Sequence, residues 1–126
     1  MAGSCGASPR QSFTVGRLSQ TVSLLFGGRR CGTTLGAPCR LRGRTFRFVV
    51  EAPDAPLRAA VSVRLGRRDT GWQTVVRRSG RVDAVGNAAF GRLPSLRAGL
   101  WRVSADIRGD ADVSPARAVA YVRLFD

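Results

Sequence analysis

Residues Leu100–Arg108 read LWRVSADIR, and this stretch decides the fold class. In an extended chain Trp101, Val103, Ala105 and Ile107 lie on one side, and the residues between them, mostly polar or charged, lie on the other. Such alternation is typical of a β-strand with one buried and one solvated face. A shift of one residue would expose the whole apolar set, so the pattern also favours a single register.

Similar short stretches recur from Thr21 onward, and Gly, Pro and Asp separate them at intervals of about ten residues. No stretch shows the apolar spacing of a helix. The pattern predicts an all-β, antiparallel sandwich of about seven strands in residues 21–126, preceded by a flexible leader in residues 1–20. The expected strands are Thr21–Phe26, Thr45–Glu51, Ala59–Leu65, Trp72–Arg77, Ala88–Leu93, Leu100–Arg108 and Ala118–Phe125.

Large aromatic side chains are expected to fill the space between the two sheets. Trp72, Trp101, Phe46, Phe48 and Phe90 fall on the predicted inward positions, and each buries roughly 150–250 Å². With the aromatic residues assigned to the core, none is expected on the surface.

Four short motifs follow one another in the second half of the chain: GWQTV at 71–75, DAVG at 83–86, LPSLRAGLWRV at 93–103 and GDA at 109–111, with Pro115 after them. In order and spacing they resemble the immunoglobulin-like β-sandwich repeats of secreted and surface proteins of high-GC bacteria. Transthyretin-like sandwiches attached to carboxypeptidases and adhesins are a close alternative. Both families are non-catalytic, so the resemblance implies a spacer, adhesion or polysaccharide-contacting module, extracellular or at the cell surface.

Several residues of these motifs have expected structural roles. Asp83 and Gly86 suit a tight turn, because Asp accepts hydrogen bonds from backbone N–H groups and Gly tolerates a positive φ. Gly99 and Trp101 match the turn where such sandwiches place a corner Tyr. Trp101 offers a ring N–H there instead of a hydroxyl.

The chain is strongly basic: 21 basic residues, all of them Arg, face 8 acidic ones, for a net charge of +13. No acidic residue precedes Glu51. Such a field attracts nucleic acid, anionic lipid or acidic polysaccharide, without specifying which. Six arginines of the N-terminal half are the candidate polyanion-binding residues, because on one sheet face they would grip phosphates or sulfates. They are Arg29, Arg30, Arg40, Arg42, Arg44 and Arg47.

Two functional classes therefore stay open. The first is a surface module that contacts an acidic polysaccharide or a cell-surface protein. The second is a basic protein that binds nucleic acid or another polyanion through its N-terminal half. An enzyme is disfavoured because His and Lys, which supply the common general bases and Schiff-base amines, are absent.

Other features of the sequence bear on metal binding, redox state and membranes. Asp106, Asp110 and Asp112 surround one loop and are a weak candidate for Ca²⁺; no cofactor is predicted. The spacing of Cys31 and Cys39 suits a disulfide that closes a small loop. Such a bridge requires an oxidising compartment, and Cys5 would then be unpaired. No apolar run reaches the ~20 residues of a membrane span, and no export signal is evident. The sequence does not indicate an oligomeric state.

Overall fold

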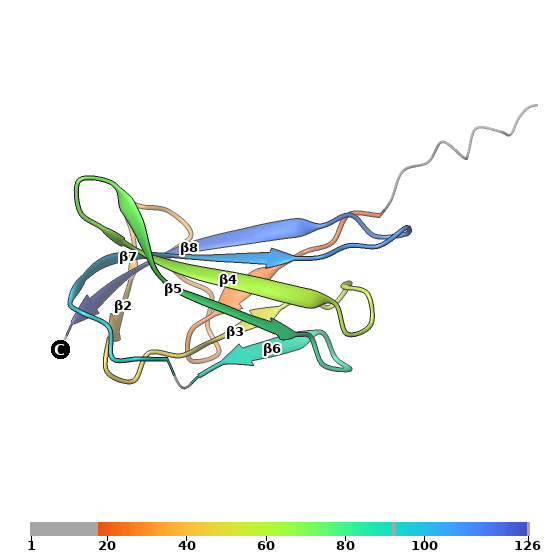
Figure 1. Cartoon of the computed structure of the whole chain (residues 1–126), viewed down its shortest axis with the longest axis horizontal. Coiled ribbons are helices and arrows are strands. Elements are labelled where there is room, and N and C mark those ends of the chain that lie inside the picture. The colour runs from red at the N-terminus through yellow and green to blue at the C-terminus, as the bar shows by residue number, and fades with distance from the viewer. Residues whose placement is uncertain (1–17, 92, 126) are drawn as a thin grey trace, which may run out of the picture.

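A computed structural model describes residues 18–91 and 93–125 of the chain. These residues form eight β-strands and no helix (Figure 1). None of the described segments could therefore cross a bilayer as a helix. The strands are β1 (Ser23–Leu25), β2 (Cys39–Arg42), β3 (Phe48–Glu51), β4 (Ala60–Arg68), β5 (Trp72–Arg81), β6 (Asn87–Phe90), β7 (Gly99–Ile107) and β8 (Ala116–Phe125).

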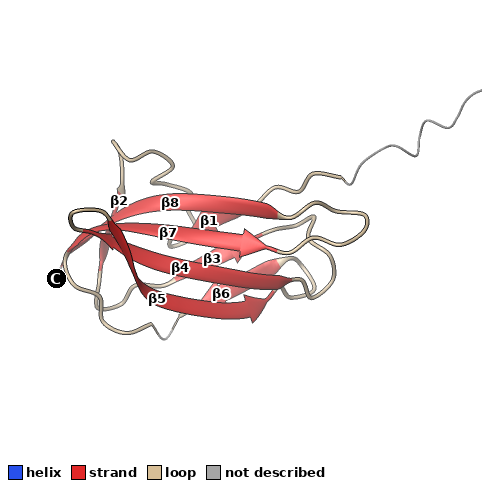
Figure 2. Cartoon of the chain, turned by 45° about the horizontal axis from the view of Figure 1, so that its top comes forward, coloured by secondary structure: helices blue, strands red, loops and turns tan. Residues whose placement is uncertain are grey.

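The strands make two sheets that lie in two layers (Figure 2). The smaller sheet has the order β1-β3-β6, and the larger has the order β2-β8-β7-β4-β5. Every strand pair is antiparallel except β2 with β8, which run parallel. The predicted all-β, sandwich-like character is confirmed, and the expected antiparallel pairing holds for every strand pair of the described residues except β2 with β8.

One hydrophobic core joins the two layers. Trp101, Val103, Ala105 and Ile107 are at most 1% exposed, so the alternation in β7 was interpreted correctly. From the facing sheet, Phe48 stacks on Phe90 with ring centroids 5.4 Å apart. Aromatic pairs at this distance stabilise a core beyond their buried area.

The turn expected at residues 83–86 is present, and contacts with the backbone explain why it needs Asp83 and Gly86. The Asp83 Oδ1 atom accepts hydrogen bonds from the N–H groups of Val85 and Asn87, at 2.9 and 3.0 Å. Gly86 has a φ of +87°, and a Cβ there would lie 2.5 Å from the Ala52 carbonyl oxygen, so only Gly fits.

Trp101, near the start of β7, makes a hydrogen bond of its own. The buried indole N–H donates to the carbonyl oxygen of Arg97 at 2.9 Å. Gly99, the first residue of β7, has a φ of +141°, which residues with a side chain rarely adopt. This hydrogen bond satisfies the ring N–H of Trp101 inside the fold, as the polar group of a buried Trp requires.

The sequence-based strand limits differ from the structure in several places, and β3 and β6 are each shorter than predicted, spanning Phe48–Glu51 and Asn87–Phe90. The structure has a strand at Cys39–Arg42 where a loop was expected. The expected loop at 66–71 is shorter, because β4 continues to Arg68. Strand β5 continues to Arg81, four residues beyond its predicted end.

The last residues of the predicted leader contact the domain. Leu18 forms an isolated parallel bridge with Val113, and the Gln20 side chain donates a hydrogen bond to the Ser114 carbonyl at 2.8 Å. Residues 1–17, including Cys5, lie outside the described residues.

Candidate polyanion-binding face

The register of the five-stranded sheet decides which side chains point away from the core. Buried residues such as Val63, Val103 and Val122 mark the inner side, and their immediate neighbours point outward. The outward positions make up the surface that we call the outer face. Its basic residues are Arg40 and Arg42 of β2, Arg117 and Arg123 of β8, Arg102 of β7, Arg64 and Arg68 of β4, and Arg77 and Arg81 of β5.

Among these outward strand positions Asp106 is the single acidic residue. Two pairs of like charges are direct neighbours: Arg64 lies opposite Arg77, and Arg40 beside Arg123. Like charges directly opposite one another destabilise a sheet. The outer face therefore concentrates positive charge and places some of it on directly neighbouring positions.

The structure separates the six arginines proposed from the sequence. Arg40 and Arg42 join the outer face through β2. The segments before and after β2 expose the other three of this group: Arg29 and Arg30 precede the strand, and Arg44 follows it. Arg47 precedes β3 and lines a hollow with Phe48 and Phe90, in the other sheet. The six arginines therefore do not lie on one sheet face. Most of the outer-face arginines lie in the C-terminal half of the chain.

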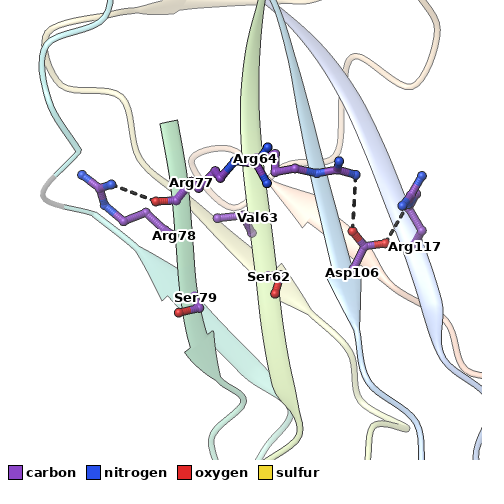
Figure 3. Close-up of a pocket in the computed structure, with 8 residues that line it drawn as sticks. All are labelled: Ser62, Val63, Arg64, Arg77, Arg78, Ser79, Asp106 and Arg117. Atoms are coloured by element: carbon purple, nitrogen blue, oxygen red, sulfur yellow. Dashed lines mark hydrogen bonds and ion pairs between the residues drawn. The ribbon is translucent and has the colours of Figure 1, made fainter. Parts of the chain in front are cut away.

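A shallow, open hollow of about 480 Å³ lies on the outer face (Figure 3). The figure shows the side chains of Arg77, Arg64 and Arg117 in a row that crosses the strands, with Ser62 and Ser79 to one side of the row. The complete lining is Ser62, Val63, Arg64, Arg77, Arg78, Ser79, Asp106 and Arg117. Such a mixture of guanidinium and hydroxyl donors suits an oxyanion.

Asp106 holds two of these arginines in place. The Arg117 Nε atom donates to Asp106 Oδ1 at 2.7 Å, and Arg64 Nη2 lies 3.7 Å from Oδ2. The hydrogen bond and the charge of Asp106 raise the pKa of Arg117. Arg77 is in no ion pair within the described residues. One carboxylate thus orders part of the row without neutralising it.

A second group of side chains lies on the outer face at the β4–β5 hairpin, and we call it the Trp72 cluster. The Trp72 and Tyr121 ring centroids are 5.9 Å apart. The guanidinium carbons of Arg102 and Arg68 lie 4.9 and 5.3 Å from the Trp72 centroid, a cation–π arrangement. The prediction that Trp72 faces the core is therefore wrong.

A β-bulge explains both the position and the reach of Trp72. The β4–β5 register shifts between Leu65, which pairs with Val76, and Gly66, which pairs with Thr74, so Val75 is an extra residue. This insertion sends Trp72 and Val76 to opposite sides of the sheet. Bulges also bend the strand, and Figures 1 and 2 show the hairpin end curling across the sheet toward β7 and β8. Trp72 thereby reaches Tyr121 across two strands.

A third aromatic residue points outward at the far edge of the sheet. Phe125 is 38% exposed, and the Arg42 guanidinium carbon lies 5.4 Å from its ring centroid. The expectation that the aromatic residues all face inward is therefore also wrong for Tyr121 and Phe125.

Two of the three carboxylates proposed to bind Ca²⁺ have separate structural roles. Asp106 pairs with arginines, as described above. Asp110 Oδ1 accepts hydrogen bonds from the N–H groups of Asp112 and Val113 at 2.8 and 2.9 Å and so caps a turn. Within residues 18–91 and 93–125 no three acidic or Cys side chains come close enough to hold a metal ion.

Cys31 and Cys39 form a disulfide, with their Cα atoms 5.6 Å apart. Cys39 opens β2, and the Gly32 carbonyl accepts a hydrogen bond from the N–H of Tyr121 in β8. The bridge therefore ties two segments that both attach to β8, at the edge where Arg40 and Arg42 lie.

Comparison with known proteins supplies no further identification. No protein-family model matches this sequence, and no curated protein shows significant similarity to it.

Proposed function

We propose that this chain is a non-catalytic module that binds polyanions through the outer face of its larger sheet. The observation that carries the proposal is the charge of that face, where nine arginines accompany one carboxylate on the outward positions of the five strands. Acidic polysaccharide and nucleic acid are the two ligand classes that this chemistry fits.

The juxtaposed arginines support binding rather than simple solvation. A solvated surface gains nothing from placing Arg64 opposite Arg77, because like charges directly opposite one another destabilise a sheet. A bound phosphate or sulfate between the two guanidiniums removes that repulsion and accepts hydrogen bonds from both. Release of condensed counterions from the ligand adds to the affinity.

The fold we propose is the immunoglobulin-like sandwich repeat of exported bacterial proteins. Support comes from the two-layered core, the turn at Asp83 and Gly86, and the hydrogen-bonded Trp101 at the corner position. The disulfide between Cys31 and Cys39 supports an extracellular or cell-surface location, because such bridges persist in oxidising compartments.

A binding titration with two matched variants tests the proposal. The face variant carries Arg64→Gln and Arg77→Gln, and the control carries Arg30→Gln and Arg47→Gln, which removes the same charge outside the outer face. Removing two phosphate contacts is expected to weaken heparin or oligonucleotide binding at least ~10-fold in the face variant and much less in the control. Equal losses in the two variants would show that net charge alone binds the ligand.

The same experiment distinguishes a binding role from a structural one. Because the substitutions relieve repulsion, the face variant should unfold at the same temperature as the native chain or higher. Weaker binding by a more stable protein assigns the arginines to the ligand.

A further inference from the structure

We propose that the polyanion is a single-stranded nucleic acid, with a base stacked at the Trp72 cluster and phosphates on the row of arginines. This inference rests on the proposed function and names the ligand of the same face.

The shape of the outer face argues against reading of the bases in a double helix. Reading the major groove of B-DNA takes a helix or a two-stranded ribbon that projects into it. The outer face consists of strands lying side by side, and the β4–β5 hairpin end beside the Trp72 cluster curls onto the sheet (Figure 2). A flexible single strand can follow such a surface with its bases turned toward the protein.

The Trp72 cluster has the chemistry of a base-stacking platform. Its members are the rings of Trp72 and Tyr121 and the guanidiniums of Arg102 and Arg68. The guanidinium carbon of Arg102 lies 4.9 Å from the Trp72 ring centroid, and that of Arg68 lies 5.3 Å from it. Unpaired bases stack on aromatic rings and on guanidinium planes alike. Guanidiniums lie over the partly exposed Trp72 ring, so a ligand meets guanidinium groups as well as aromatic carbon at this cluster. The cluster therefore favours a planar, π-bonded ligand over a carbohydrate.

The hollow lies at a suitable distance from the Trp72 cluster to bind the phosphates next to a base that stacks on the cluster. Arg102 of the Trp72 cluster and Asp106 of the hollow lie on the same face of β7, about 13 Å apart at the usual rise of a strand. Phosphates that follow the stacked base would meet Arg64, Arg77 and Arg117 there. Asp106 Oδ2 and the serine hydroxyls are the hydrogen-bonding groups available to base edges.

The test compares ligands that differ only in their bases. The full chain is titrated with an oligothymidylate of about 12 nucleotides and with an abasic strand carrying the same number of phosphates. The base-containing strand is expected to bind roughly 10-fold tighter, as stacking of one or two bases provides. Trp72→Leu should abolish this difference while leaving the affinity for the abasic strand unchanged, and Trp72→Phe should retain most of it.

The controls separate stacking from folding. Leu57→Ala removes an exposed apolar side chain from the segment between β3 and β4, outside the strands of the outer face, and should change neither affinity. If Trp72→Leu unfolds, Tyr121→Leu replaces it, because the Tyr121 ring centroid lies 5.9 Å from that of Trp72 and the substitution removes no arginine from the outer face. A purely structural role of Trp72 would lower both affinities equally, and the inference would then be wrong.

The remaining outcomes also decide the question. Equal binding of the two strands, or tighter binding of a duplex of the same length, overturns the single-strand proposal. If heparin still binds through Arg64 and Arg77 in that case, the proposed function stands with a polysaccharide as the ligand. Failure of every polyanion to bind overturns both proposals.

Discussion

Asp83 shows how one exposed carboxylate can organise a turn. It accepts hydrogen bonds from the N–H groups of Asn87 and Val85, and these bonds lower the pKa of its carboxyl group. A depressed pKa in the folded state means that ionised Asp83 stabilises the fold at pH values above its unfolded pKa. That contribution disappears as the pH falls through the lower, folded pKa.

We therefore expect Asp83→Asn to change the pH dependence of stability. Asn keeps the acceptor oxygen but carries no charge, so the variant should be less stable than the native chain at pH 7. The difference should shrink as the pH falls below about 4, the usual range for an Asp. Thermal unfolding followed by circular dichroism between neutral and acidic pH measures this, and parallel curves for the two proteins would contradict it.

Single residues also show why part of the outer face could not be predicted from the sequence. Trp72 and Val76 are four positions apart, so strict alternation places them on the same side of a strand. The extra residue Val75 puts them on opposite sides, and nothing in the sequence marks Val75 as unpaired. Tyr121 and Arg123, by contrast, alternate with buried Ala120 and Val122, so their outward position was predictable.

At the scale of elements, strands with clean alternation were predictable and short or edge strands were less so. Strands β7 and β8 lie inside the larger sheet, and burial of one side imposes the pattern on them. Strand β2 has four residues in a loop rich in Gly and Pro, and its parallel partner β8 is far away in sequence. Strand β5 is an edge strand, and its charged residues protect that edge from pairing with another chain.

The attachment of β2 gives a prediction about the disulfide. Replacing Cys31 and Cys39 by Ser opens a loop with a sequence separation of 8, which should cost about 2–3 kcal/mol of unfolding free energy. Because β2 is short and pairs only with β8, it should detach first. Hydrogen exchange should show faster exchange at Arg40 and Arg42 in the double variant, with β4 and β7 still protected. Uniform acceleration across all strands would contradict this local role.

Considered as a whole, the molecule carries a net charge of +13, and much of it lies on one face. Self-repulsion of this size destabilises the compact state. Salt screens such repulsion over a Debye length of about 10 Å at 0.1 M, which is about two strand spacings. The native chain should therefore become more stable as NaCl is added, in contrast to a protein held together by surface ion pairs.

Unfolding temperatures measured from low salt to about 0.3 M NaCl should rise for the native chain and rise less for the Arg64→Gln, Arg77→Gln variant. NaCl is the appropriate salt, because sulfate also stabilises proteins by exclusion from their surface. At low salt a polyanion that binds the folded face should raise the unfolding temperature further, in proportion to the logarithm of its concentration over Kd. A fall in unfolding temperature with NaCl would mean that attractive ion pairs such as Asp106–Arg117 outweigh the repulsion, and the electrostatic basis of the proposed function would be lost.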